Sequence, residues 1–342
     1  MTTKGNSLYN LLIINTLSNI STINKWRQTF LLETFILFLS IKGRINFLQL
    51  ERYGKYSEQR YRQLPSYRDD FIKAGKKTPG LGYFWSGQAG QAKRGLEITG
   101  IAAIDIDHHT GFHLEAVQTI IKEDETMLDS GFHFISRLRD DANLKYLYSG
   151  EPTGKRGRPK KHGGKVEPNN LDKDVFALVE TRDGTLLHTA LVYSVSLERN
   201  VRIVHLQTSN DKGKTGYKLY FCTDIEMDAA RILHYYRSRF QIEFLYRDAK
   251  QHTGLNNCQA RSENKLHFQF NAALSAINIA KAVHWISIPR EQRKAFSMND
   301  IKTMNHNALL LERFFTMFGL NPHLTKNQKH VKELIYYGTI AA

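Results

Sequence analysis

The sixteen residues Tyr235-Tyr-Arg-Ser-Arg-Phe-Gln-Ile-Glu-Phe-Leu-Tyr-Arg-Asp-Ala-Lys250 lie in the last third of a chain of 342 residues. Within them Tyr236, Arg239, Glu243 and Lys250 stand at offsets of 0, 3, 7 and 14. At about 100° per residue, a helix brings these four side chains within about 60° of one another, onto one stripe. The pattern therefore predicts a helix that presents one carboxylate among two cations and a phenol.

The flanking residues favour one long helix, because Asp228 suits an N-cap and Gly254 suits a C-terminal stop. We expect this helix to run from Ala229 to His252. A carboxylate on it can ligate a divalent ion, and Arg, Lys and Tyr can hold the phosphates beside the bond that is cut. The alternative is a solvated helix face on which Glu and Lys only pair.

The composition favours a globular protein that binds nucleic acid. Hydrophobic residues make up 41% and aromatic residues 11% of the chain, which is enough for a sizeable core, and the length allows two or three domains. A formal net charge of +15 predicts a polyanionic partner, nucleic acid first, with a basic ribosomal or membrane-surface protein as the alternative.

We expect a cytoplasmic, nucleoid-associated protein without a membrane segment. The two cysteines, Cys222 and Cys258, cannot form a disulfide framework or a structural zinc site, which indicates a reducing compartment. The most apolar run, Phe30 to Ile41, contains Glu33 and is shorter than the roughly 20 residues needed to cross a bilayer. It also lies too far from Met1 to be a signal peptide.

Apolar periodicity predicts the other elements. A helical region over residues 23–63, divided at Gly43, suits either a small DNA-binding unit or a core-forming hairpin with a basic solvated face; its second helix runs from Arg44 to Arg62. Further helices are expected at Phe268–Trp285 and Asn307–Phe318. Strands are expected at Ile98–Asp107, Phe132–Leu138, Val175–Glu180, Leu186–Val195, Val201–Gln207 and Tyr217–Cys222, with a turn at Asp183-Gly184.

The spacing Tyr-(2)-Arg-(3)-Glu-(6)-Lys resembles the signature of the bacterial insertion-sequence transposases of the insertion-sequence-four superfamily. Four fixed positions of this kind recur by chance in about one chain in a thousand or fewer. Three further pieces resemble one subgroup of these transposases: Phe30–Asn46, Gly75–Gly87 and Phe132–Asn143. The resemblance extends in pieces over roughly residues 24 to 290.

This resemblance implies an α/β fold: a ribonuclease-H-like catalytic core with an inserted antiparallel β unit, preceded by a helical N-terminal region and followed by C-terminal helices. It implies a DDE-type DNA transposase that binds the ends of a mobile element and catalyses metal-dependent cleavage and strand transfer. Glu243 would be the last member of an Asp-Asp-Glu triad that holds Mg²⁺, with Mn²⁺ as a substitute. Tyr236, Arg239 and Lys250 would position the double-stranded DNA, on which such proteins act as homodimers.

Six segments are expected along the chain. They are a weakly structured leader (1–22), a helical DNA-binding region (23–63), the first part of the ribonuclease-H-like core (67–144), a basic loop with the β insertion (145–222), the catalytic helix with the rest of the core (223–290) and the C-terminal helices (291–342). The leader mixes Asn, Ser and Thr with isolated Leu and Ile, which is why no stable element is expected there.

The first catalytic aspartate of the family lies at a strand end shortly before the counterpart of Phe71, where this chain offers Asp69 and Asp70. Both are candidates for the catalytic residue, and the expected metal ligands are Asp70 and Glu243. Pro65 precedes them, and no apolar run marks the strand that should present the aspartate.

The second aspartate of the family would fall between Thr119 and Gly131, where Asp124 is the candidate. About ten residues are too few for the strand, turn and helix expected there. Either another carboxylate substitutes or the site is incomplete, so we hypothesise an internally shortened transposase. The alternative function is a catalytically impaired DNA-binding relative that occupies element ends without cleaving them.

Asp105 and Asp107 share one strand face and could bind metal, although burial at a sheet end or plain exposure explains them more simply. The run Ile104-Asp-Ile-Asp-His-His109 also resembles the Asp-His-His phosphoesterases, whose other acidic motifs are not recognisable here. We expect His108 and His109 to be exposed turn residues.

The basic stretch Lys155-Arg-Gly-Arg-Pro-Lys-Lys161 resembles an AT-hook, whose Arg-Gly-Arg-Pro core lies in the minor groove of A·T-rich DNA. In that interpretation Arg156, Arg158 and Lys160 bind DNA, and the arginines meet the enhanced negative potential of the narrow groove. A flexible loop that binds phosphates without specificity is the alternative.

Overall fold

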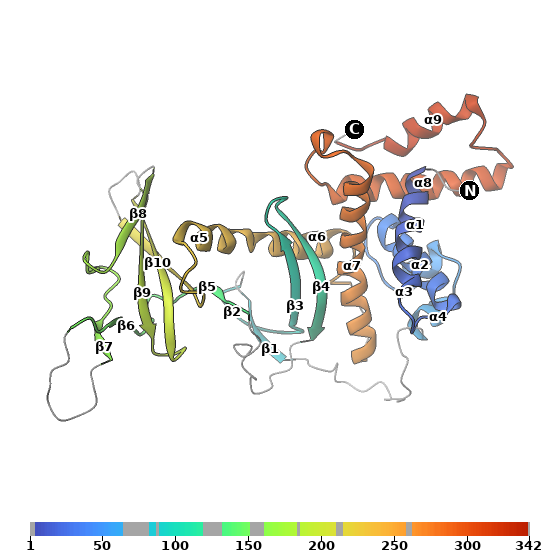
Figure 1. Cartoon of the computed structure of the whole chain (residues 1–342). Coiled ribbons are helices and arrows are strands. Elements are labelled where there is room, and N and C mark those ends of the chain that lie inside the picture. Colours follow the sequence, from blue (N-terminus) through green and yellow to red (C-terminus); the bar gives the residue numbers. More distant parts are fainter. Residues whose placement is uncertain are drawn as a thin grey trace. The chain divides into compact units, whose positions relative to one another are not determined.

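Two compact units make up the chain: unit 1 comprises Met1–Ile121 and Gln241–Ala342, and unit 2 comprises Lys122–Phe240. The computed structural model describes residues 4–63, 82–86, 89–118, 132–150, 161–182, 185–209, 215–257 and 262–340. Helices form both ends of the chain and sheets form its middle (Figure 1). This confirms the expected α/β class and is consistent with a ribonuclease-H-like core.

The described residues of unit 1 form helices and two β-hairpins. Its helices are α1 (Lys4–Ser18), α2 (Lys25–Ser40), α3 (Phe47–Tyr53), α4 (Glu58–Gln63), α6 (Phe240–His252, from Gln241 onward), α7 (Glu263–Ser287), a 3-10 helix (Arg290–Gln292), α8 (Met298–Phe318) and α9 (Thr325–Tyr336). Its strands are β1 (Gly82–Ser86), β2 (Gln91–Gly95), β3 (Ile98–Asp105) and β4 (Thr110–Gln118). β1 pairs with β2 and β3 with β4, both antiparallel. Helix α7 lies between β4 and the N-terminal helices (Figure 1).

Helix α7 forms the centre of the unit 1 core. Leu266, Phe270, Ala273, Leu274 and Ile277 recur at short helical steps and are all buried. This apolar face packs against buried residues of α2, α3 and α6, so one cluster joins segments from both ends of the chain. The core of unit 1 can therefore form only when residues after 240 pack against residues before 122.

Two asparagines of α7 cover the outer edge of β4. Asn271 Nδ2 donates to the Ala116 carbonyl over 2.8 Å, and its Oδ1 accepts from the Ala116 N–H over 2.9 Å. Asn278 makes the same two bonds with His113, at 2.7 and 2.8 Å. Seven helical residues rise about 10.5 Å, which matches the roughly 10 Å spanned by three strand residues. Each side chain therefore replaces a neighbouring strand at its position.

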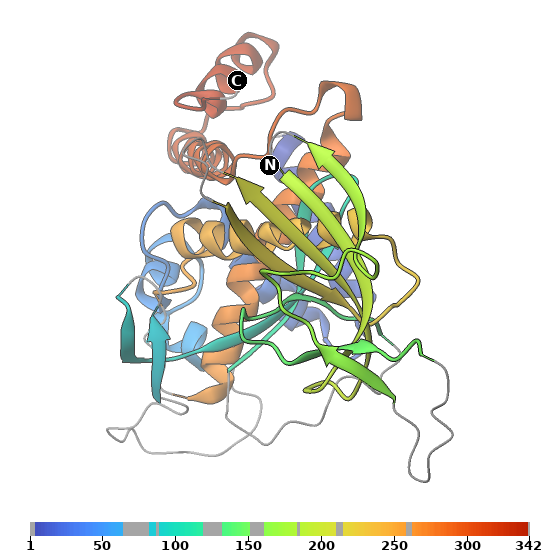
Figure 2. The ribbon, with the colours of Figure 1, turned by 90° about the vertical axis from the view of Figure 1, so that its left-hand side faces the viewer.

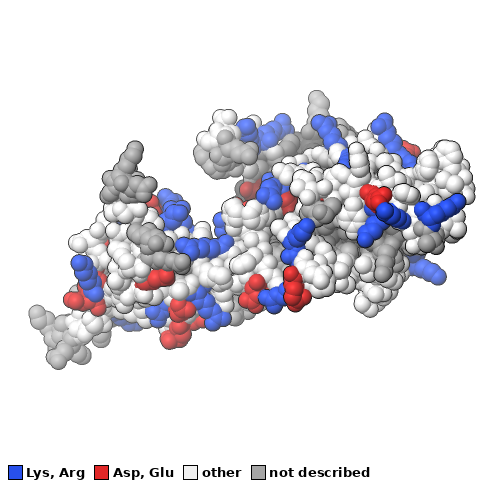
Figure 3. Space-filling view, turned by 90° about the horizontal axis from the view of Figure 1, so that it is seen from above, with Lys and Arg blue, Asp and Glu red and all other residues white. Residues whose placement is uncertain are grey.

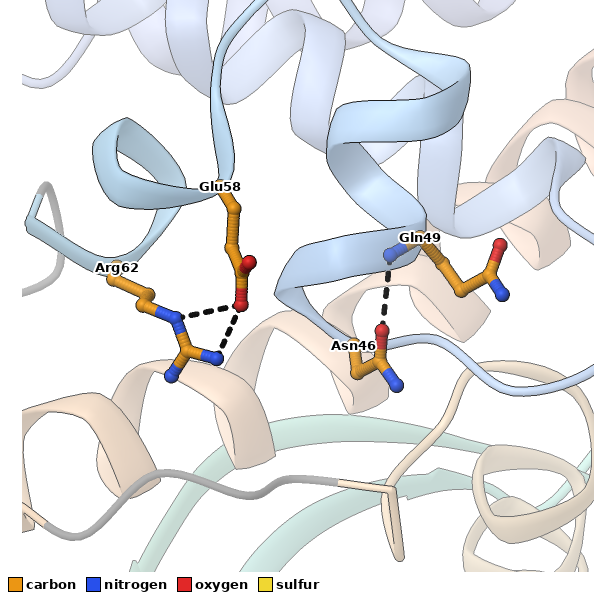
Figure 4. A network of polar contacts seen from close by, with 4 residues as sticks. All are labelled: Asn46, Gln49, Glu58 and Arg62. Carbon is orange, nitrogen blue, oxygen red and sulfur yellow. Dashed lines mark hydrogen bonds and ion pairs between the residues drawn. The ribbon is translucent and has the colours of Figure 1, made fainter.

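Helices α2 to α4 belong to the same core. The Asn46 side chain accepts from the Gln49 N–H over 2.9 Å at the start of α3, and Glu58 accepts from Arg62 Nε over 2.9 Å along α4 (Figure 4). Phe47 in α3 is buried in the cluster around α7. The structure thus confirms the core-forming role weighed for residues 23–63, and DNA binding by this region stays a prediction.

The described residues of unit 2 form a seven-stranded sheet and one helix. The strands are β5 (Ile135–Arg137), β6 (Leu144–Leu147), β7 (His162–Lys165), β8 (Ala177–Arg182), β9 (Thr185–Ser194), β10 (Arg199–Ser209) and β11 (Thr215–Cys222), and the helix is α5 (Ala229–Ser238). Their order is β5-β11-β10-β9-β6-β7, with β8 also paired to β9, and every pairing among the described strands is antiparallel. Figure 2 shows the long strands of this twisted sheet in green and yellow.

Both faces of the unit 2 sheet are covered. Ile203 and Val204 are neighbours on β10, point to opposite faces and are both fully buried. Ile203 packs in a cluster that includes Val166 and Phe176, while Val204 packs with residues of α5. Helix α5 therefore covers one face, and the segment before β8 covers the other.

Two expectations about helices before residue 64 are wrong. The weakly structured leader expected over residues 1–22 is wrong for Lys4–Ser18, which forms α1 and buries Tyr9, Ile13 and Leu17 at four-residue steps. The helix expected from Arg44 to Arg62 is divided into α3 and α4. The division falls at Gly54, where a Cβ would lie 2.6 Å from the Leu50 carbonyl oxygen, so only glycine fits.

The strands expected after residue 174 are present with small shifts at their ends, whereas the one expected over Phe132–Leu138 is limited to β5. The Asp183-Gly184 turn lies outside the described residues, as does Cys258; Cys222 is buried and free. Among the described helices, none is both long and apolar enough to cross a membrane.

Candidate functional site

Helix α5 begins at Asp228 with the predicted N-cap. The Asp228 carboxylate accepts hydrogen bonds from the N–H groups of Ala230 and Arg231 at 2.8 and 3.4 Å. These bonds satisfy donors of the first turn that have no partner within the helix. Ile232 and Leu233 then bury the helix in the sheet cluster.

The first half of the signature is held by the unit 2 sheet. The Tyr236 ring packs against the Tyr220 ring with 4.7 Å between their centres. Burial and the neighbouring Tyr236 phenol raise the pKa of Tyr220. The guanidinium carbon of Arg239 lies 5.6 Å from the centre of the Tyr236 ring, and the Arg239 side chain is exposed. Unit 2 thus presents a fixed phenol with an exposed cation beside it.

The second half of the signature lies on α6. Leu245 and Ala249 are buried in the unit 1 core. Glu243 and Lys250 are exposed on the same helix. The apolar residues therefore fix the helix, and Glu243 and Lys250 lie at exposed positions of it.

The predicted single helix from Ala229 to His252 is wrong, because the chain forms α5 and α6 with Arg239 between them. Arg239 keeps helical backbone angles, φ −52° and ψ −28°, but its N–H bonds the Tyr236 carbonyl three residues back, over 3.2 Å. The boundary between the two units comes one residue after Arg239, since unit 2 ends at Phe240. The predicted stop at Gly254 is confirmed, since α6 ends at His252 and Gly254 has a φ of +73°.

Two glycines let the β3–β4 hairpin approach α6 closely. A Cβ at Gly100 would overlap the Tyr246 hydroxyl, and one at Gly111 would lie 3.3 Å from the Gln241 carbonyl oxygen. Burial raises the pKa of Tyr246, which keeps its hydroxyl neutral. The hairpin therefore contacts α6 at Gly100, where a larger side chain would displace the Tyr246 hydroxyl, and at Gly111, where it would crowd the α6 backbone.

The Asp-His-His segment forms a turn. Asp105 accepts from the His108 N–H over 3.0 Å, and the His108 ring Nδ1 lies 3.0 Å from its other carboxylate oxygen. Burial acts to raise the pKa of Asp105, but the His108 hydrogen bonds and charge outweigh it and the net shift is downward. Asp107, His108 and His109 are exposed, which confirms the expected turn.

The metal ligands expected beside Glu243 cannot be placed. Asp69, Asp70 and Asp124 lie outside the described residues, and so do Arg156, Arg158 and Lys160 of the AT-hook-like stretch. Within the described part of the chain, no group of three or more His, Cys, Asp or Glu side chains is placed to hold a metal ion. The expected metal site therefore stays a prediction.

Unit 1 also contains a pocket that the sequence analysis missed. Its volume is about 530 Å³, and its lining includes Arg247, Asp248, Lys281, Trp285, Arg290 and Arg293. One signal in the sequence could have pointed to this pocket: Lys281 interrupts the largely apolar run from Ile277 to Trp285. The sequence did not indicate which residues would surround it.

Basic side chains are spread over the surface. On the face seen in Figure 3, the described Lys and Arg side chains stand in separate groups rather than in one continuous strip. The described basic side chains on this face therefore do not by themselves mark a DNA-binding surface.

Residues 125–279 match the family model of the transposase DDE domain. The matched region contains all four signature residues from Tyr236 to Lys250 and begins after Asp124. The match supports a DDE transposase. No curated protein matches the chain.

Proposed function

We propose that the protein is a DDE-type DNA transposase of the insertion-sequence-four superfamily, which binds mobile-element ends and catalyses phosphodiester cleavage and strand transfer. One observation carries the proposal: the transposase DDE match covers a helix on which Glu243 and Lys250 are exposed. Such a carboxylate suits an ion-assisted attack on a phosphodiester.

The signature residues have separate roles in this proposal. Arg239 and Lys250 are exposed cations that pair with phosphates of the element end. Tyr236 positions Arg239, because its ring lies beneath the guanidinium and is itself packed on Tyr220. The partners are double-stranded DNA ends and a DNA target, bound by a homodimer.

The expected cofactor is Mg²⁺, with Mn²⁺ as a substitute. Glu243 offers a hard oxygen ligand of the kind Mg²⁺ prefers. The described residues alone form no group of three or more side chains that could hold the ion. Asp70 is the proposed second ligand. We derive no catalytic step through the ion.

A strand-cleavage assay on DNA that carries the element's termini, with Mg²⁺ or Mn²⁺, tests the proposal. We expect nicking by the parent chain and background levels for Glu243→Ala. Glu312→Ala is the matched control, because Glu312 is an exposed carboxylate on α8 of the same unit, and it should cleave as the parent does. Equal cleavage by the parent and Glu243→Ala would overturn the role of Glu243.

A catalytically impaired DNA-binding relative is the second candidate. One observation favours it: the segment between Thr119 and Gly131 is too short for the expected strand and helix. Retention of terminal DNA on a filter, without nicking by the parent chain in either metal, would support this candidate over the first.

A further inference from the structure

A basic pocket in unit 1 lies apart from the four signature residues, none of which lines it. Side chains of α6, the end of α7 and residues 290–296 surround it, together with the turn at His108 to Thr110. Five of the lining residues are cationic and one is acidic. The cationic ones are Arg247, Lys281, Arg290, Arg293 and Lys294, and the acidic one is Asp248.

Lys281 supplies a buried positive charge. Its side chain is 5% exposed, and its Nζ donates to the Gly111 carbonyl over 2.6 Å. The rings of Phe112 and Phe296 lie 5.8 Å from Nζ. Burial lowers the pKa of Lys281 to about 8, and the charge of the nearby Asp248 carboxylate acts in the opposite direction. Among the ion pairs of the described residues none includes Lys281. A buried cation without a paired anion is destabilising, so an anion in this pocket would offset part of that penalty.

Arg293 is fixed in place before any ligand arrives. Its Nε donates to the Ile288 carbonyl and its Nη2 to the Trp285 carbonyl, each over 3.1 Å. Its guanidinium carbon lies 5.5 Å from the Trp285 ring centre. A guanidinium held in this way loses little further freedom when an anion binds. The only acidic residue of the lining is already engaged, because Asp248 pairs with Arg247 over 3.1 Å.

We propose that this pocket binds a phosphate of the DNA backbone, with Lys281, Arg290 and Arg293 supplying the charge. The identification of DNA as the source of the phosphate rests on the proposed function; the anion-binding chemistry does not. Guanidinium and ammonium groups are the usual partners of backbone phosphates. The pocket would therefore add a contact to one strand at a position distinct from Arg239 and Lys250.

Binding of inorganic phosphate to the full chain, without metal, tests the pocket directly. Trp285 lines it and contacts Arg293, so its fluorescence should change in a saturable way. We expect Arg290→Gln to weaken binding about three- to tenfold and Lys281→Met to abolish it. Lys329→Gln removes an exposed charge of α9 outside the pocket and should leave binding unchanged. Trp285→Phe should lose the optical signal while calorimetry still detects binding.

Titration of duplex DNA at several salt concentrations tests the source of the phosphate. Loss of one backbone contact lowers the slope of log affinity against log salt by about 1. We expect this change for Arg290→Gln and no change for Lys329→Gln. An unchanged slope, or acetate binding as tightly as phosphate, would overturn the proposal. Arg290 is exposed, so this variant should fold even if Lys281→Met does not.

The measurements are made in the Glu243→Ala background, where cleavage plays no part. Failure of the parent chain to cleave DNA would thus overturn the proposed catalytic function and leave the pocket proposal standing. If the parent chain cleaves DNA but Arg290→Gln leaves the slope of log affinity against log salt unchanged, the pocket proposal alone is overturned.

Discussion

The two units hold the two halves of one sequence motif by different means. In unit 2, α5 packs on a sheet whose described strands all come from one continuous stretch of the chain, β5 to β11, and Tyr236 lies against Tyr220 of β11. In unit 1, α6 packs into a helical cluster that joins residues before 122 with residues after 240. A motif that is contiguous in sequence therefore depends on two separate cores, and each half can be perturbed through its own.

The largest effects should come from cavities in the two cores. Leu274 in unit 1 and Ile203 in unit 2 are both fully buried, so alanine at either should cost about 2–5 kcal/mol. Hydrogen exchange should become faster in α6 and α7 for Leu274→Ala, and in β9 to β11 and α5 for Ile203→Ala. If either variant accelerates exchange equally throughout the chain, the two cores do not act separately.

A pair of glycines tests how tightly α6 is joined to the unit 1 core. Gly254 has a φ of +73°, and a Cβ there would lie 2.7 Å from Ile45 Cβ. Gly319 has a φ of +61° with open space around it. We expect Gly254→Ala to cost about 2–4 kcal/mol, from backbone strain and overpacking, and Gly319→Ala about 1–2 kcal/mol from strain alone. Equal losses in urea unfolding would show that packing around Gly254 is loose.

The pH dependence of stability should also distinguish the units. Burial, together with the charge of Lys42, lowers the pKa of Lys302 in unit 1 from 10.5 to about 7. Between these values the unfolded chain binds more protons than the folded chain, so unit 1 should become more stable as pH rises from about 7 to 10. The slope from one such group is at most about 1.4 kcal/mol per pH unit.

Lys302→Met should remove this part of the slope, and Lys329→Met, at an exposed position of α9, should not. Lys281 contributes in the same direction, since burial lowers its pKa to about 8, so a smaller slope should remain. Denaturant unfolding at pH 7, 8.5 and 10 checks the result. A Lys302→Met profile parallel to that of the parent would contradict it.

The smallest effect should follow from the cap of α5. Asp228→Ala removes the acceptor for two N–H groups and should cost about 1 kcal/mol. Asp228→Asn keeps an acceptor oxygen and should be close to the parent. Exchange rates of the first turn of α5 report the difference directly. Indistinguishable rates in Asp228→Ala would mean that packing of Ile232 alone fixes the start of this helix.

Local patterns predicted much of the fold. Alternation located β9 to β11, and the Asp228 cap and the turn after Asp105 were both recognised from residue type. The break at Arg239 was missed because no Gly or Pro marks it. It coincides with the change from packing in the sheet cluster to packing in the helical cluster, which is tertiary information.

The roles of the four signature residues stay a prediction. The exposure of Glu243 and Lys250 agrees with a helix that offers these groups to a ligand. The basic pocket could not be predicted, because it combines residues near 108, 247, 281 and 293 that only tertiary packing brings together. α1 was missed for a different reason, since Asn and Ser between its buried residues weakened the helical pattern.

The paired amide bonds of Asn271 and Asn278 have a consequence for solubility. An uncovered strand edge can recruit a strand of another molecule, and such pairing begins domain swapping and fibril growth. Along β4, the peptide groups of His113 and Ala116 already have both hydrogen-bonding positions filled by side chains of the same molecule. These two uncharged asparagines therefore block the pairing of a foreign strand at these two positions of the β4 edge.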